Sequence, residues 1–70
     1  MSEAQIIALA RRFAEERGWT WYEPVVVRAR QWKNLASFQV DTHAGSRGAN
    51  IRMILAAADG RLLHAAYLPR

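Results

Sequence analysis

The sequence predicts an α+β fold, in which one amino-terminal helix packs on a three- to four-stranded antiparallel meander in two layers. Up to Gly18 the apolar residues recur at helical spacing, whereas the rest of the chain is rich in aromatic and β-branched residues with alternating polarity. The chain has 70 residues and no linker-like stretch, so a single domain over residues 1–70 is expected.

A helix is predicted over residues 3–17. Ser2 and Gln5 have the spacing of a capping box, in which the serine hydroxyl accepts from the Gln5 amide and the glutamine side chain reaches back. Ile6, Leu9 and Phe13 then form one apolar stripe at intervals of three and four residues. Gly18 follows, and glycine readily adopts the left-handed conformation that ends a helix.

Four strands are predicted, over residues 24–31, 36–43, 50–57 and 61–68. In the first of them valines and arginines alternate, which places the apolar side chains on one face of the sheet and Arg28 and Arg30 on the other. The stretch from Trp32 to Leu35 is expected to be the turn between the first two strands.

The last two strands are predicted to form a hairpin. Asp59-Gly60 lies between two apolar segments, which favours a two-residue type I′ turn. This turn would pair Arg52 with Tyr67 and so place Tyr67 on the face that carries the arginines.

The other sheet face is expected to hold the core against the helix. Its predicted members are apolar residues from all five elements: Ile6, Leu9, Phe13, Val25, Val27, Phe38, Val40, Ile51, Met53, Leu55, Leu62 and Leu68. Three tryptophans, Trp19, Trp21 and Trp32, lie in the connections, where they suit either core or contact positions.

Charge is distributed unevenly along the chain. The formal net charge is +4, but residues 1–23 hold three Arg against four Glu, whereas residues 24–70 hold six Arg and Lys33 against two Asp. The predicted sheet is therefore the basic part and favours anionic partners. The absence of cysteine excludes disulfides and thiolate sites, and the amino terminus lacks the features of a signal peptide. A cytoplasmic protein without membrane association is expected.

The face away from the helix is the predicted binding surface. Its centre is apolar and its rim is basic, which is typical of a surface for a protein partner or a second copy of the chain. The predicted contact residues are Arg28, Arg30, Arg47, Arg52, Ile54, Arg61, Leu63 and Tyr67. The alternative is that the amino-terminal or aromatic segments of the same chain cover this apolar centre.

A second hypothesis is single-stranded nucleic-acid binding, with the arginines on phosphates and Tyr67 on a base. No enzyme, cofactor or small-molecule substrate is predicted. Asp41 and His43 are the one pair placed to share a metal ion or a proton, but they lack a third ligand. The loop around Gly45 and Gly48 lacks the Gly-Lys-Ser/Thr ending of a phosphate-binding loop.

The order of elements carries a family resemblance. A helix, the strand Phe38-Gln39-Val40-Asp41, a glycine-containing loop and an apolar strand leading into Asp59-Gly60-Arg61-Leu62-Leu63 follow one another. Over residues 3–67 this order resembles the small bacterial PepSY-type and cystatin-like (NTF2-like) domains. The resemblance implies a non-catalytic module, such as an inhibitory or immunity-type protein, and no catalytic residue carries over.

Overall fold

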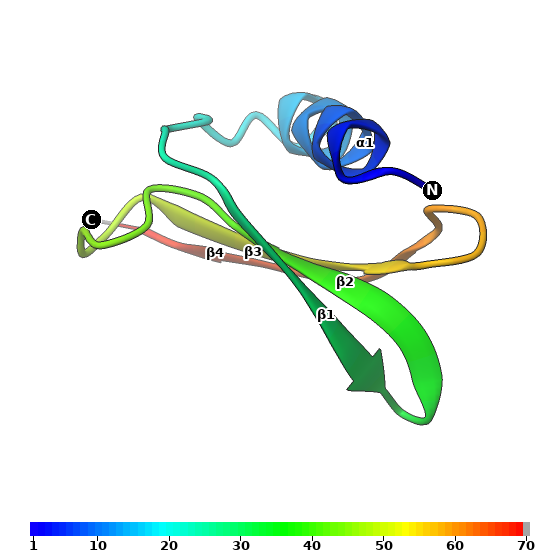
Figure 1. The fold of residues 1–70 in the computed structure, drawn as a ribbon. Coiled ribbons are helices and arrows are strands. Elements are labelled where there is room, and N and C mark those ends of the chain that lie inside the picture. Colours follow the sequence, from blue (N-terminus) through cyan, green and yellow to red (C-terminus); the bar gives the residue numbers. More distant parts are fainter. Residues whose placement is uncertain (70) are drawn as a thin grey trace.

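The computed structural model describes residues 1–69 and confirms the predicted α+β fold. Its elements are α1 (Glu3–Glu16), β1 (Val26–Trp32), β2 (Leu35–Asp41), β3 (Asn50–Ala56) and β4 (Leu62–Leu68). The strands lie in chain order and each pairs antiparallel with the next. Figure 1 shows α1 lying across one face of the sheet, so the molecule has two layers. The predicted boundaries differ from these by at most two residues.

The predicted helix ends are confirmed. The Gln5 amide donates to Ser2 Oγ at 3.2 Å, and the Ser2 amide donates to Gln5 Oε1 at 2.8 Å, which completes the capping box. At the other end Gly18 has a φ of +71°, and the amides of Gly18 and Trp19 donate to the carbonyls of Glu15 and Ala14. This is a Schellman motif, in which a left-handed residue lets the chain leave the helix.

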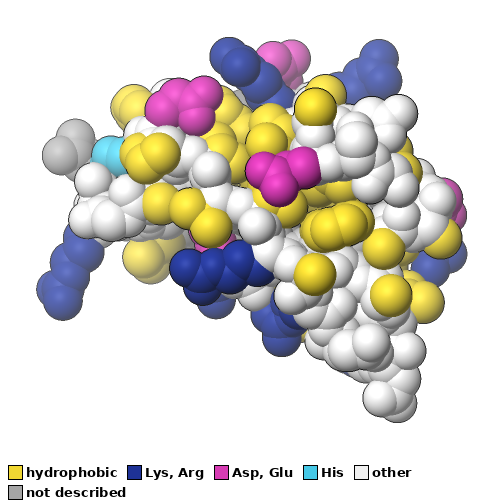
Figure 2. Space-filling model, in the orientation of Figure 1, with side chains coloured by type: hydrophobic (Ala, Val, Ile, Leu, Met, Phe, Trp, Pro, Cys, Tyr) yellow, Lys and Arg dark blue, Asp and Glu magenta, His cyan; other side chains and the backbone are white. Residues whose placement is uncertain are grey.

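The core lies between α1 and the central strands, as predicted, but the prediction of Leu68 as a core residue is wrong, because this side chain is 60% exposed. Two helix alanines, Ala10 and Ala14, are fully buried, and their small side chains let the helix approach β2 and β3 closely. Trp19 and Trp21 pack against the margin of this core, so these two tryptophans are packing residues. Figure 2 shows apolar side chains gathered between the two layers, with lysine and arginine side chains at the margins and below the apolar band. The fully enclosed cluster is Ile6, Ala10, Ala14, Val40, Ile51, Met53 and Leu55.

The type I′ turn lies elsewhere than predicted. Lys33 and Asn34 have φ of +49° and +68°, and they join β1 to β2 in the two-residue geometry that needs positive φ at both central positions. Between β3 and β4 only Gly60 has positive φ, at +74°, and the connection runs from Ala57 to Arg61. The Gly60 amide donates to the Ala56 carbonyl at 2.8 Å, which makes this turn longer than the two residues expected.

The longer turn overturns the predicted pairing of β4. Leu62 pairs with Leu55 and His64 with Ile54, so Leu63 is an extra residue at an irregularity in the strand. Beyond it Tyr67 pairs with Ile51, which belongs to the core. Because a slip of one residue exchanges the two faces of a strand, the prediction that Tyr67 shares the face of the arginines is wrong. Its ring instead stacks on Trp19, with centroids 5.5 Å apart.

The outer face, away from α1, is covered by the sheet itself. The β1–β2 hairpin bends away from the helix (Figure 1), and the Trp32 ring stacks on His64 with centroids 5.1 Å apart. These residues belong to opposite edge strands, so their contact spans β2 and β3. Between them Ile54 is fully buried, and the prediction of an exposed apolar centre at Ile54 is wrong. Leu63 is half-buried.

The β3–β4 turn is packed against the amino-terminal end of α1, and Gly60 makes this packing possible. A Cβ atom at Gly60 would meet Leu9 Cδ1 and Met1 Sδ, whereas one at Gly18 would meet nothing. Both glycines have φ above +70°. Gly18→Ala therefore isolates the cost of positive φ, which is about 1–2 kcal/mol.

We predict that Gly60→Ala lowers the free energy of unfolding by about 1–3 kcal/mol more than Gly18→Ala, because its methyl group also overpacks the contact with Leu9. Urea unfolding of both variants measures the difference. Equal losses would show that the turn does not press on the helix.

Candidate functional site

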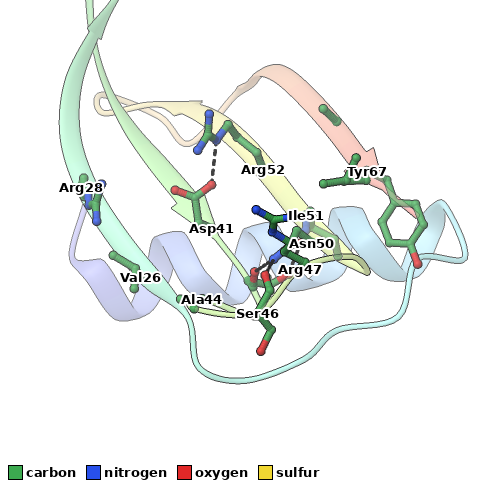
Figure 3. A pocket seen from close by; sticks show the side chains of 14 residues that line it. Val26, Arg28, Asp41, Ala44, Ser46, Arg47, Asn50, Ile51, Arg52 and Tyr67 are labelled. Atoms are coloured by element: carbon green, nitrogen blue, oxygen red, sulfur yellow. Dashed lines mark hydrogen bonds and ion pairs between the residues drawn. The ribbon is translucent and has the colours of Figure 1, made fainter. Parts of the chain in front are cut away.

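A hollow of about 640 Å³ opens on the outer face, at the end of the sheet where β2 leads into β3. Its walls come from all four strands and from the loop formed by residues 42–49, with Asp41 at the end of β2 as the contribution of that strand. In Figure 3 Arg28 stands on one side, Tyr67 on the other, and Arg47 reaches between them from the loop. The lining residues are Val26, Arg28, Asp41, Thr42, Ala44, Gly45, Ser46, Arg47, Asn50, Ile51, Arg52, Ala66, Tyr67 and Leu68.

The hollow is basic. Its lining holds Arg28, Arg47 and Arg52, and Asp41 is the one acidic residue among the described lining residues. Arg52 Nε donates to Asp41 Oδ1 at 2.8 Å, and the arginine side chain remains 58% exposed. This is the one ion pair found within residues 1–69, so neither Arg28 nor Arg47 is neutralised by a described carboxylate.

A chain of polar side chains holds Asp41 in place. Gln39 Nε2 donates to Asp41 Oδ2 at 2.8 Å, and Arg30 donates to Gln39 Oε1. With Arg52 this chain crosses β1, β2 and β3 on the outer face. Gln39 is nearly buried, so its amide is confined to one orientation and leaves Asp41 little freedom to turn away from Arg52.

The loop that closes the hollow is organised by Asn50. Its Nδ2 amide donates to the carbonyls of Thr42, His43 and Ser46 at distances of 3.0–3.2 Å. The backbone amide of His43 also donates to the Tyr22 carbonyl at 2.9 Å, which ties the loop to the segment before β1. Arg47 therefore projects from a tethered loop, although the glycine content predicts a flexible one.

The structure brings together half of the predicted contact residues. Arg28, Arg47, Arg52 and Tyr67 line the hollow, although Tyr67 does so from the core side of the sheet. Arg30 lies next to it, with its guanidinium 5.4 Å from the centre of the Trp32 ring.

The other predicted contact residues lie outside the hollow. Arg61 belongs to the β3–β4 turn, at the opposite end of the sheet. Ile54 is buried between the strands, and Leu63 lies at the irregularity in β4.

Asp41 and His43 do not form a shared site. β2 ends at Asp41, and His43 has a φ of +54°, so strand alternation no longer aligns the two side chains. Each is engaged elsewhere, since Asp41 pairs with Arg52 and His43 Nδ1 lies 2.9 Å from the Gly48 carbonyl oxygen. Within residues 1–69 no three His, Cys, Asp or Glu side chains are grouped closely enough to hold a metal ion.

Asn50, which organises the loop beside the hollow, was not predicted from the sequence. Its signal is its position, because an asparagine next to a glycine-containing loop is well placed to bond backbone groups with its side chain. Strand alternation also predicts Asp41 on the same face as the arginines, and the pairing of Asp41 with Arg52 across β2 and β3 confirms this position. The ion pair between the two side chains was not predicted.

We predict that Asn50→Ala lowers the free energy of unfolding by about 1–3 kcal/mol, because three loop carbonyls lose their donor. Urea unfolding measures the loss. Gln31→Ala, which removes an exposed amide on β1, is the matched control and should change stability by less than about 0.5 kcal/mol. An Asn50→Ala variant as stable as the control would contradict the role assigned to Asn50.

Comparison with known proteins identifies no relative of this chain. Neither the family models nor the curated proteins nor the solved structures provide a match. The resemblance to PepSY-type and cystatin-like domains therefore stays a prediction. Within residues 1–69 the structure has no helix long and apolar enough to cross a membrane.

Proposed function

We propose that the chain is a non-catalytic interaction module that binds an acidic segment of a partner protein in the arginine-lined hollow. The observation that carries the proposal is the clustering of Arg28, Arg47 and Arg52 around one carboxylate, Asp41. The described lining of the hollow thus has more positive than negative charge. Guanidinium groups bind carboxylates through paired N–H donors in a planar fork, so Asp and Glu side chains suit these arginines.

The accessibility of the arginines supports this proposal. Arg28, Arg47 and Arg52 are all exposed, and Arg52 uses only its Nε in the bond to Asp41. Their remaining N–H groups are free to meet an incoming anion. The net charge of +4 also attracts an acidic partner over distance and speeds its encounter with the hollow.

Single-stranded nucleic acid is the second candidate, because the same arginines suit phosphate groups. Such binding draws about 1–3 kcal/mol per base from stacking on aromatic rings. Two rings bear on this alternative, and both are already engaged: Tyr67, which lines the hollow from the core side, stacks on Trp19, and Trp32 on the outer face stacks on His64. The lack of a free stacking ring favours an acidic protein segment over a nucleic acid.

The non-catalytic part of the proposal rests on Asp41 and His43. The carboxylate of Asp41 accepts from both Arg52 and Gln39, and the His43 ring is held between the Gly48 carbonyl and the Tyr22 ring. In the proposal both side chains act structurally, Asp41 as the ion-pair partner of Arg52 and His43 as part of the loop. A cytoplasmic setting, expected from the sequence, is part of the proposal.

We predict that Arg47→Glu weakens binding of a fluorescein-labelled glutamate-rich peptide by about tenfold or more, which corresponds to about 1.4 kcal/mol. The reason is that the substitution removes a guanidinium from the hollow and adds a carboxylate. Fluorescence anisotropy at low salt measures the affinity. Arg61→Glu makes the same change of net charge at the opposite end of the sheet and should leave the affinity nearly unchanged.

Three outcomes would contradict the proposal. Equal losses for Arg47→Glu and Arg61→Glu would indicate attraction by net charge alone. Absence of peptide binding by the wild-type chain would exclude an acidic segment of this kind. If an oligothymidylate binds instead, with an affinity that falls steeply with added salt and with Arg47→Glu, the nucleic-acid function is correct.

A further inference from the structure

The sheet ends in two edge strands of different character. The strand order β1-β2-β3-β4 leaves one side of β1 and one side of β4 without a neighbouring strand. Among the described residues, β4 makes its backbone hydrogen bonds to β3, and no loop makes a backbone hydrogen bond to its outward edge. An uncovered edge presents a row of backbone donors and acceptors that can pair with another strand.

Charge distinguishes the two edges. β1 carries the exposed Arg28 and Arg30, and charged side chains of this kind protect an edge strand from pairing. β4 contains no Lys, Arg, Asp or Glu, and Leu68 at its end is 60% exposed. β4 is therefore the edge suited to strand addition.

We propose that a second copy of the chain pairs antiparallel along β4, so that two sheets join into one across a twofold axis near Ala66. This register uses the five residues that follow the irregularity at Leu63. It sets Ala66 opposite its own copy and His64 opposite Leu68, and no like charges meet. Pairing β4 with β4 of the second copy uses the β4 edge of both copies, so the assembly closes as a dimer. Pairing β4 with β1 would leave one β4 edge open for a further copy, and the assembly would continue into a filament.

The pairing brings the two hollows together. Ala66, Tyr67 and Leu68 line the β4 side of each hollow, so the second copy would extend this wall with its own β4. Arg52 pairs with Ala66, which puts the two Arg52 backbones about three strand spacings apart, or about 14 Å. Beyond a screening length of about 8 Å at physiological ionic strength, the repulsion between these arginines is weak. The joined hollows form one basic surface with twofold symmetry.

The decisive experiment measures mass by sedimentation as a function of concentration. We expect the wild-type chain to reach twice its 8.0 kDa mass. Ala66→Lys places two like charges together at the twofold axis and should shift the chain to monomer. Ala29→Lys, at an exposed alanine of the other edge strand, is the matched control and should leave the dimer intact. Thermal melting followed by circular dichroism checks that each variant is folded, and Leu68→Glu provides a second variant at the same edge.

Three results would overturn the proposal. One is a wild-type chain that stays monomeric at every concentration, and another is a folded Ala66→Lys variant that remains dimeric. The third is a monomer whose β4 amides gain protection from hydrogen exchange only when the glutamate-rich peptide is added, which would assign the edge to a peptide strand. Ala66 lines the hollow, so peptide affinity is measured on the wild-type chain at concentrations below those at which it dimerises. Failure of the dimer then does not decide the function of the hollow.

Discussion

A single helix of 14 residues covers only one face of a sheet that has two. The second face is covered by the sheet itself. The β1–β2 hairpin bends so that Trp32, on one edge strand, stacks on His64, on the other. Beneath this contact Ser37 and Ile54 are removed from water. Burying one isoleucine side chain contributes about 1.5–3 kcal/mol, a large share of the 5–15 kcal/mol that stabilises a typical domain. The outer face is therefore part of the packing of the molecule.

The same bend shapes the candidate site. It makes the outer face concave, and Arg28 of β1 and Arg52 of β3 then border one hollow, which the loop carrying Arg47 closes at its end. Arginine suits such a position because its long stem lies along apolar surface while its guanidinium reaches water. Asp41 neutralises part of this charge and, through Gln39, links the strands beneath. Fold stability and anion binding thus draw on the same curvature.

Local sequence patterns predict most of this fold. They fail where the position of a residue depends on contacts with strands that are distant in the sequence. Three predictions rest on neighbouring residues only: the capping box, the glycine after the helix and the alternation of Arg28 with valines. The structure confirms all three. The face of Tyr67 depends on one extra residue in β4, and nothing in its local alternation reveals that residue. The type I′ turn is found at Lys33-Asn34, and the connection that contains Asp59-Gly60 is longer than two residues and packs against α1. A contact with a helix some fifty residues away in sequence cannot be predicted from the Asp-Gly pair alone.

The sequence predicts part of the candidate site as well. Arg28, Arg47 and Arg52 follow from alternation and from charge, whereas the burial of Ile54 depends on an indole that reaches across two intervening strands. No periodicity in a single strand can report such a contact. The tethering of the loop by Asn50 is likewise a property of how three carbonyls converge in space.

The closure of the outer face by Trp32 is tested most directly by proton NMR on the wild-type chain. Nuclear Overhauser effects between the indole protons of Trp32 and the ring protons of His64 are the predicted result, because the two rings stack at 5.1 Å. Absence of these effects in a folded chain would contradict the contact between Trp32 and His64. It would also contradict the explanation that bending of the β1–β2 hairpin forms the hollow.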